Sequence, residues 1–357
     1  DIETEIAIIG AGVAGIATAY YLCRQNPRCQ PVILDVQNPM GLTSAQSGEN
    51  YRNWWPHPTM AAFTNQSIGL MESIARETNN AIAMTRRGYA LATRRQKVDD
   101  LVDQLYDGYG KDPSALIRFH NDPQSNSYSL VPAADWQEAP DGVDVLQDQN
   151  LIRRVFPSFS HEVSHVLHIR RAGDISSQQL GQFMLEKIKQ SGGKCLTKRV
   201  VDLDTRPDGF AIQATSSAGD CLIHAEKICI AAGPFAPDLA SMLGVELPIE
   251  NVFQQKITFE DRLGAIPRQM PFAIDLDELQ LDWDAEERAL LTGDRDMAWL
   301  TKTMPGGIHC RPDGGSWVRL GWAFNVSASE PVWEPDLNPQ YPEIVLRAAS
   351  RLNPALK

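Results

Sequence analysis

The sequence predicts an α/β fold, with a Rossmann-like nucleotide-binding domain that is discontinuous in sequence and a second, mainly antiparallel-sheet domain. Three observations predict it. An apolar stretch at residues 5–9 runs directly into a glycine turn at residues 10–15. A second apolar stretch, residues 31–34, ends at Asp35. Residues 250–325 then show the alternation of apolar and polar side chains that is typical of antiparallel strands.

The first unit is a strand, a glycine turn, a helix and a strand that ends in an acid, which together form a dinucleotide-binding fingerprint. Gly10 permits the tight turn, Gly12 lets the backbone approach a pyrophosphate, and Gly15 lets the helix pack on the strand. The first N–H groups of the helix face the phosphates, and Asp35 accepts hydrogen bonds from ribose hydroxyls. A glycine-rich turn without a ligand is the alternative, but the flanking strands and the acid favour a dinucleotide. The motif leaves NAD, NADP and FAD open.

Composition narrows the class of protein. The 357 residues carry a formal net charge of −12, which argues against a nucleic-acid or anionic-membrane partner. The sequence shows no apolar stretch as long as a membrane span and no signal peptide. Its six cysteines form neither a CxxC pair nor a metal-ligand pattern. We therefore expect reduced thiols, no metal site and a cytoplasmic location.

The elements after Asp35 follow from periodicity and composition. Apolar residues at helical spacing predict a helix at 59–79, and residues 87–92 resemble a short strand. A second helix is expected at 94–106. Residues 107–150 are rich in Asp, Pro, Ser, Gln and Asn, which predicts a looped excursion.

The second half of the chain is expected to begin with a helix at 176–190, which a Gly-Gly pair ends. The elements expected after it are a strand at 194–201, a hairpin of 209–215 and 221–224, a buried strand at 227–234, and strands at 257–260 and 317–322. An acidic stretch, residues 275–287, is expected to face solvent.

These elements predict two domains built from alternating parts of the chain. Residues 1–90 and 155–245 form the nucleotide-binding domain, and residues 91–154 and 246–330 form the substrate domain. Residues 331–357 are expected to start a C-terminal segment that leads back to the nucleotide-binding domain, and this segment looks truncated.

Four segments, in this order and spacing, resemble the D-amino-acid oxidase, glycine oxidase and sarcosine oxidase superfamily of FAD-dependent amine oxidoreductases. They are the fingerprint with Asp35, the Ser/Ala/Gly-rich residues 41–50, the Gly-Asp-Ile at 173–175 with the helix and strand that follow, and the Ala-Ala-Gly-Pro element at 230–236. Residues 304–313 add a weaker match. The resemblance implies bound FAD, contacted by Gly10, Gly12, Val13, Ala14, Gly15, Asp35, Val36, Thr43, Ser44, Ala45, Ser47, Gly48, Glu49, Asn50, Val200, Val201, Ala231, Ala232 and Gly233.

The sequence departs from the family in two places. The family's last FAD-contacting segment, near the C-terminus, has no counterpart before Lys357. Either a second polypeptide completes the flavin site, or the segment lies outside the present sequence. Many oxidases of the family place a lysine near the flavin, whereas the matching stretch at 262–265 has none and Lys256 is merely close in sequence.

The chemistry that the resemblance implies needs positioning more than a strong acid or base, because the substrate carbon gives up a hydride to the flavin. A substrate carboxylate would need an arginine, and Arg52 and Arg311 are the candidates by position, with a solvated surface charge as the alternative for each. Tyr51, Trp54 and Trp55 are expected to wall the pocket, although two tryptophans capping a core would give the same pattern. His57 orients substrate or abstracts a proton, or simply forms hydrogen bonds within a loop.

The function predicted from the sequence is FAD-dependent oxidation of the C–N bond of an amino acid or secondary amine, giving an imine that hydrolyses. The alternative is a flavoprotein subunit of a multi-chain dehydrogenase with a structural or electron-relay role. A nicotinamide-dependent dehydrogenase is disfavoured, because such folds follow the first unit with more parallel units. The expected partner is a small amine or amino acid.

Overall fold

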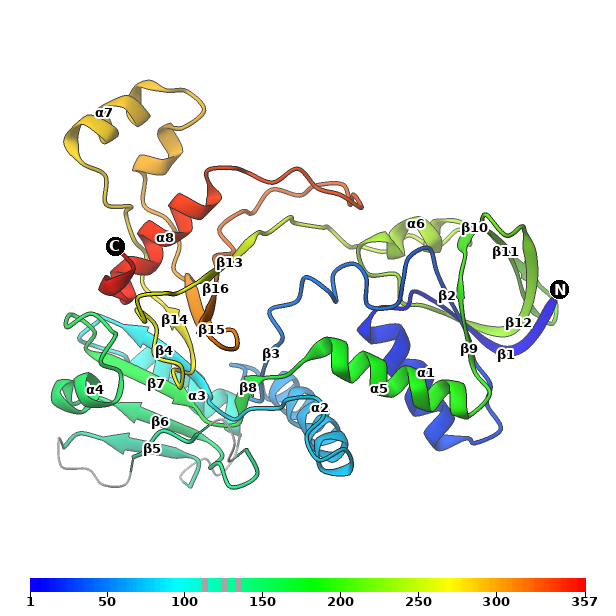
Figure 1. The fold of residues 1–357 in the computed structure, drawn as a ribbon, viewed down its shortest axis with the longest axis horizontal. Coiled ribbons are helices and arrows are strands. Elements are labelled where there is room, and N and C mark those ends of the chain that lie inside the picture. Colours follow the sequence, from blue (N-terminus) through cyan, green and yellow to red (C-terminus); the bar gives the residue numbers. More distant parts are fainter. Residues whose placement is uncertain (111–114, 123–127, 133–135) are drawn as a thin grey trace.

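The computed structural model describes residues 1–110, 115–122, 128–132 and 136–357. Two sheets dominate it and lie at opposite ends of the molecule (Figure 1). The N-terminal sheet has six strands in the order β10-β11-β12-β1-β2-β9. Its strands are β1 (Ile2–Ile9), β2 (Val32–Asp35), β9 (Lys194–Thr197), β10 (Arg199–Arg206), β11 (Gly209–Thr215) and β12 (Cys221–Ile230).

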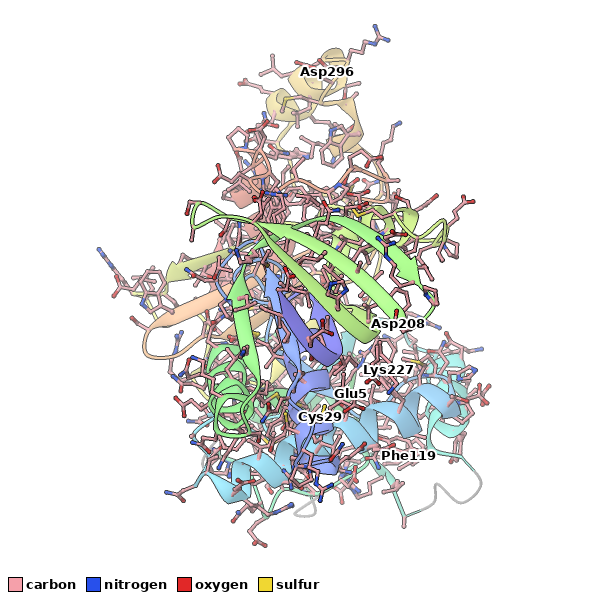
Figure 2. The ribbon with its side chains drawn as sticks, turned by 90° about the vertical axis from the view of Figure 1, so that its right-hand side faces the viewer. Glu5, Cys29, Phe119, Asp208, Lys227 and Asp296 are labelled. Atoms are coloured by element: carbon pink, nitrogen blue, oxygen red, sulfur yellow. The ribbon has the colours of Figure 1, made fainter. Side chains whose placement is uncertain are left out.

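Four of these strands, β12, β1, β2 and β9, run parallel, and β10 and β11 add an antiparallel hairpin at one edge. The register between β1 and β12 brings Glu5 beside Lys227, whose Nζ lies 3.5 Å from the carboxylate (Figure 2). A central strand buried on both faces must be apolar throughout, which explains the unbroken apolar run at the end of β1. The predicted parallel Rossmann-like sheet is confirmed.

Helices cover one face of this sheet. Helix α1 (Val13–Gln25) and helix α5 (Ser177–Gln190) pack on each other, and α2 (Pro58–Glu77) joins the same apolar cluster. The side chain of Ser176 accepts a hydrogen bond from the N–H of Gln179, which fixes the start of α5. A short turn, η2 (Gly233–Phe235), and α6 (Ala236–Ser241) follow β12. The glycine turn therefore lies at the edge where the parallel strands end.

The second sheet has eight strands in the order β13-β16-β15-β14-β4-β7-β6-β5. Pairs β4–β14 and β5–β6 are parallel, and the other neighbours are antiparallel. The strands are β4 (Tyr89–Thr93), β5 (Ile117–His120), β6 (Val143–Leu146), β7 (His165–Ile169), β13 (Lys256–Glu260), β14 (Phe272–Asp275), β15 (His309–Pro312) and β16 (Trp317–Gly321). The mainly antiparallel second sheet predicted from the sequence is confirmed.

The two faces of this sheet have different neighbours. Helices α4 (Gln149–Val155) and α8 (Tyr341–Leu352) pack on one face, in a cluster with Cys310, Leu320 and Trp322. The other face carries Tyr89, Leu91 and Phe272 together with Trp54, and α3 (Asp99–Tyr109) packs there through Leu105. This second face is the one that meets the nucleotide-binding half of the molecule.

A two-stranded sheet of β3 (Asn50–Arg52) and β8 (Ala172–Asp174) lies between the halves. On the other side, two long connections run beside each other, joined by a bridge between Val252 and Ala328 (Figure 1). Trp333, on one of these connections, stacks on Phe235 with ring centres 4.4 Å apart. The remaining elements, α7 (Ala285–Gly293), η3 (Ala298–Thr301) and η4 (Pro354–Leu356), lie at the far end of the second half.

Several elements differ from their predictions. The loop predicted at 107–150 is wrong in its described parts, which contain β5, β6 and the start of α4; four-residue strands within a polar segment are too short to show a period. The helix predicted at 94–106 begins at Asp99 and ends at Tyr109. Residues 221–224 and 227–230 form one strand, whereas the strand predicted at 194–201 is divided at Lys198.

The acidic stretch at 275–287 does not uniformly face solvent. Asp275 is completely buried, and its carboxylate accepts hydrogen bonds of 2.9 and 3.0 Å from the guanidinium of Arg94. Asp277 pairs with the same arginine at 3.2 Å. A buried carboxylate is tolerated because it is paired and hydrogen-bonded. The sequence could not show this, because Arg94 lies far away along the chain.

Among the described residues, no helix is both long enough and apolar enough to cross a lipid bilayer. The domain boundaries predicted from the sequence stay a prediction.

Buried histidine makes the stability of the second sheet depend on pH. His168 donates from Nε2 to the carbonyl of Arg87 (2.8 Å), so its neutral Nδ1 accepts the hydroxyl of Tyr128 (2.9 Å). Burial lowers the pKa of His168 to about 3. At pH values between this pKa and the ordinary histidine pKa of about 6.5, His168 is protonated in the unfolded chain but neutral in the folded chain. Stability is therefore complete above this window and falls as the pH drops through it.

We expect the free energy of unfolding to fall by about 1.4 kcal/mol per pH unit for this one group between roughly pH 6 and 4. Urea unfolding at pH 7, 5.5 and 4.5 measures it. His168→Gln should flatten the slope, whereas His161→Gln, at an exposed position, should leave it unchanged. An equal slope in both variants would show that other groups carry the effect.

Candidate cofactor and substrate site

The glycine turn is built so tightly that side chains are excluded. Gly10 has a φ of +112°, and a Cβ atom there would lie 2.3 Å from the carbonyl oxygen of Ala231. A Cβ atom at Gly15 would lie 1.9 Å from the carbonyl oxygen of Gly10. The backbone N–H of Ala231 donates to the carbonyl of Ile9 at 2.7 Å, which holds the end of β12 against the turn. The two glycines are therefore required by the fold, and the turn is pressed between β1 and the segment after β12.

The start of α1 fits the diphosphate of a dinucleotide. Gly12 is the N-cap, and the N–H of Val13 donates to Oγ of Ser44 at 2.9 Å. In the part of the chain that the structure describes, the N–H groups of Gly12 and Ala14 have no hydrogen-bond partner. Free N–H groups beside a hydroxyl at a helix N-terminus form an anion site. Gly12, Val13, Ala14 and Ser44 thus lie together at the start of α1.

Asp35 closes the turn. One carboxylate oxygen accepts the N–H of Ala11 at 2.7 Å, and the other accepts the N–H of Gln37 at 2.9 Å. Each oxygen keeps a second lone pair for a ribose hydroxyl. Asp35 therefore has a structural role in addition to the ligand role predicted for it.

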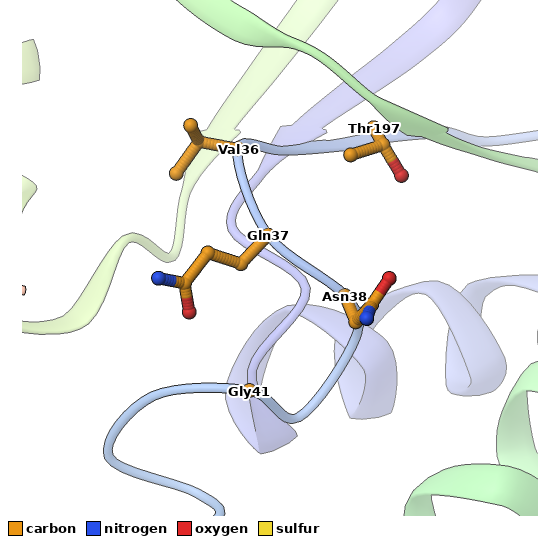
Figure 3. A pocket seen from close by; sticks show the side chains of 5 residues that line it. All are labelled: Val36, Gln37, Asn38, Gly41 and Thr197. Carbon is orange, nitrogen blue, oxygen red and sulfur yellow. The ribbon is translucent and has the colours of Figure 1, made fainter.

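A hollow of about 410 Å³ lies beside Asp35, at the carboxyl ends of β2 and β9 (Figure 3). Ligands of open α/β sheets bind at this edge. Val36 lines the hollow, as expected for a cofactor contact, together with Gln37, Asn38, Gly41 and Thr197. Sequence reasoning missed Gln37, Asn38 and Thr197. Thr197 pairs with Asp35 across the parallel strands, a register that no local pattern reveals.

The predicted contacts at Val200 and Val201 fall on a bulge in β10. The register with β11 shifts between Val200 and Asp202, so Val201 has no residue opposite it. Val201 is 47% exposed, whereas Val200 packs in the apolar cluster of the sheet. A bulge leaves backbone groups unpaired, and these suit hydrogen bonds to an adenine ring.

Residues 43–50 run along the boundary between the two halves. Thr43, Ala45 and Gly233 are exposed, and Ala232 is half-buried. Glu49 has a φ of +59°, and its carboxylate accepts hydrogen bonds of 2.9 Å from both the N–H and the hydroxyl of Ser177. The amide oxygen of Asn50 is buried without a partner among the described residues. A buried orphan acceptor on this segment is consistent with a polar ligand beside it.

Arg311 is only 4% exposed and has several partners. Its guanidinium lies 2.9 Å from Asp313 and 3.7 Å from Glu49, and it donates to the carbonyl of Gly48 at 3.1 Å. Arg319 donates in the same way to the carbonyl of Ser47 at 2.8 Å. Burial lowers the pKa of Arg311, and the neighbouring carboxylates oppose this. These contacts tie the 47–49 segment to the second sheet.

We expect Arg311→Met to weaken FAD binding by about tenfold or more, because it removes the hydrogen bond to Gly48 and leaves Arg319 as the single cation beside Asp313 and Glu49. Titration of apoprotein with FAD, followed by flavin fluorescence, measures the change. Arg262→Met removes an exposed arginine paired with Glu260 and serves as the control. A raised half-saturation for substrate with unchanged FAD affinity would contradict this and return Arg311 to the role predicted from the sequence.

Arg52 has a different environment. Its guanidinium carbon lies 4.1 Å from the ring centre of Trp55 and 5.6 Å from that of Tyr89. No carboxylate or carbonyl pairs with it within the described residues. Burial lowers the pKa of Arg52, because water has been removed and no acid replaces it. Because this guanidinium is desolvated, stacked on aromatic rings and without an acidic partner, it is suited to bind an anion.

The remaining residues of segment 51–57 lie in different places. Tyr51 faces away from Arg52, because strand neighbours alternate, and its hydroxyl donates to the carbonyl of Thr85 in the core. Trp54 is buried against α3, whereas Trp55 is 36% exposed beside Arg52. His57 is exposed at the start of α2 and makes no capping hydrogen bond. The structure thus brings Arg52 together with Trp55 and with Trp54, whose ring centre lies 5.9 Å from the guanidinium carbon, and leaves Tyr51 and His57 outside that contact.

Comparisons with known proteins agree with this geometry. Residues 5–357 match the family model described as DAO, FAD dependent oxidoreductase. Glycine oxidase from Geobacillus kaustophilus is similar in fold, with a TM-score of 0.66, 14% identity, and coverage of 100% of this chain and 80% of that chain. L-proline dehydrogenase from P. horikoshii has a TM-score of 0.69 and 14% identity, over 99% of this chain and 78% of that one. Iminodiacetate oxidase from Chelativorans sp. BNC1 has a TM-score of 0.63 and 18% identity, over 98% and 79%.

The comparison with curated proteins finds no match. The family match confirms the resemblance predicted from the motifs and, through the family, the FAD cofactor.

Proposed function

The chain belongs to the FAD dependent oxidoreductase family, and from this premise we propose that it oxidises the C–N bond of an amino acid whose carboxylate binds Arg52. The observation that most directly supports a substrate with a carboxylate is the unpaired guanidinium of Arg52. Trp55 and Tyr89 hold the charge in place by stacking, and burial withholds water from it. A carboxylate there gains charge-assisted hydrogen bonds that nothing in the described protein supplies.

When bound, FAD supplies the acceptor for the hydride that leaves the substrate carbon. The residues of this chain bind and orient. The turn at Gly10–Gly15, the start of α1 and Asp35 would hold the ADP half of the cofactor. Arg52 fixes the carboxylate, and the nitrogen lone pair forms the C=N bond as the carbon–hydrogen bond breaks. Water then hydrolyses the imine to a keto acid and ammonia or an amine, or to an aldehyde and an amine.

The reaction is tested by anaerobic reduction of the bound flavin. A panel of amino acids and N-methyl amino acids should bleach the visible flavin bands, whereas the matching amines without a carboxylate should act far more slowly. Admission of air then distinguishes the two enzyme classes, because the visible flavin absorbance returns rapidly in an oxidase and slowly in a dehydrogenase. Bleaching by none of the panel would contradict the proposal and favour a structural or electron-relay subunit.

A further inference from the structure

Helix α2 lies at the surface of the molecule and carries an exposed apolar stripe (Figure 1). Met60, Phe63 and Leu70 are three and seven positions apart along the chain, a spacing that places them on one side of a helix. Phe63 is 66% exposed, and Met60 and Leu70 are exposed as well. The other side of α2 is buried in the first half of the molecule through Ile68 and Ala75. The stripe is therefore additional to the apolar residues that hold α2 in the fold.

The outer face of α2 also lacks charge. Residues 58–71 contain no Lys, Arg, Asp or Glu. Glu72, the first acid after them, is buried in ion pairs with Arg86 and Arg171. Surface helices normally carry charged side chains on the side opposite the core. An uncharged helix face that exposes large apolar side chains is typical of an interaction surface.

The neighbouring helix α3 carries an acidic stripe. The two helices pack on each other, and a Cβ atom at Gly108 of α3 would lie 2.2 Å from the carbonyl oxygen of Trp55, shortly before α2 begins. Asp99, Asp103 and Asp107 follow at intervals of four positions, so they share one side of α3. All three are exposed, and within the described residues none has an ion-pair partner. An apolar stripe and an acidic stripe thus lie on adjacent helices.

We propose that α2 and α3 form a docking surface for an amphipathic helix of another protein. The apolar side of that helix packs on Met60, Phe63 and Leu70, and its Lys and Arg side chains pair with the aspartates of α3. The 20 residues of α2 extend over about 30 Å, which suits a partner helix of similar length. The area of such a contact is small, so the complex is transient, with a Kd in the micromolar range.

The charge pattern favours a basic partner over other occupants of this surface. A second copy of this chain would bring aspartates against aspartates, and the whole chain carries a formal net charge of −12. An anionic lipid surface would be repelled by the same carboxylates. A helix with basic residues beside its apolar side is attracted, and the acidic stripe on one flank fixes its orientation.

The test measures binding of a designed peptide to the full chain with FAD bound. The probe is a fluorescein-labelled peptide of about 18 residues, long enough to form a helix, with leucine on one side and lysine on the other. A second peptide replaces every lysine by glutamate, and a third replaces every leucine by glutamine. Fluorescence anisotropy gives the Kd of each peptide.

Two double variants remove one stripe each, and each has a matched control. Phe63→Ser/Leu70→Ser removes apolar side chains from α2, and Leu263→Ser/Leu290→Ser removes two exposed leucines elsewhere. Asp103→Asn/Asp107→Asn neutralises α3, and Asp208→Asn/Asp220→Asn neutralises two exposed aspartates of the first sheet. All eight positions are exposed, so we expect each variant to keep its flavin absorbance and melting temperature.

We expect the Leu/Lys peptide to bind in the micromolar range and each stripe variant to weaken it about tenfold or more. Both control variants should change its Kd less than about twofold, and the glutamate and glutamine peptides should bind far more weakly. Equal weakening by stripe and control variants would overturn the proposal, because the net charge of the protein would then explain the binding. A wild-type dimer in sedimentation that Phe63→Ser/Leu70→Ser dissociates would also overturn it and assign the stripe to a second copy. Cosedimentation with phosphatidylcholine vesicles that the same variant abolishes would overturn it in favour of a lipid surface.

Discussion

Arg52→Met is expected to raise the half-saturation for an amino-acid substrate by about 100-fold or more while FAD stays bound. Methionine keeps the length of the side chain and its contact with Trp55, but removes the charge and every donor. A buried charge-assisted pair of this kind is typically worth about 2–5 kcal/mol, and about 2.7 kcal/mol corresponds to 100-fold. The effect should be large because the guanidinium has no competing acid among the described residues.

Steady-state kinetics and flavin absorbance measure both halves of this prediction. Arg52→Lys should recover part of the binding, since a point charge remains without the fork. Arg76→Met is the matched control, because Arg76 also lies against a tryptophan, Trp136, with its guanidinium carbon 5.8 Å from the ring centre. A normal half-saturation in Arg52→Met with a normal flavin spectrum would remove Arg52 from the substrate site.

The contrast between Arg52 and Arg311 shows where sequence reasoning stops. Both stood as equal candidates, because each lies in a segment that resembles the family. Their difference is in their partners. Arg311 contacts Asp313, two positions away, and the carbonyl of Gly48, which is 263 positions away. Tertiary pairing of the second kind has no local signature, so the sequence could not assign one arginine to the fold and leave the other free.

The same distinction holds for the elements. The first strand, glycine turn, helix and Asp35 were predictable, because their physical requirements lie within a short window of sequence. The direction in which the side chain of Tyr51 points was not predictable, because it depends on the pairing of β3 with β8, more than a hundred residues later in the chain. The strands β5 and β6 were missed because each has four residues, too few to show a period within a polar segment. Burial that arises from distant partners, such as that of Asp275, requires the fold itself.

Gly10→Ala is expected to abolish stable FAD binding and to lower the melting temperature clearly. The added methyl group would lie 2.3 Å from the carbonyl oxygen of Ala231 and 2.9 Å from the N atom of Ala232. Both are backbone atoms, so no flexible side chain can move aside. The end of β12 must shift, and with it the turn that positions the start of α1. The φ of +112° adds conformational strain of order 1 kcal/mol.

Gly219→Ala separates the steric effect from the conformational one. Gly219 has a φ of +110°, nearly that of Gly10, but no heavy atom lies within 4 Å of the position where its Cβ would be. The two variants therefore share the backbone strain and differ in the collision with the strand end. Thermal unfolding should show a small loss for Gly219→Ala and a large one for Gly10→Ala. In FAD titrations of the apoproteins, only Gly10→Ala should fail to saturate. Equal behaviour of the two would mean that strain alone, and not the close approach of Ala231, makes glycine necessary at the first position of the turn.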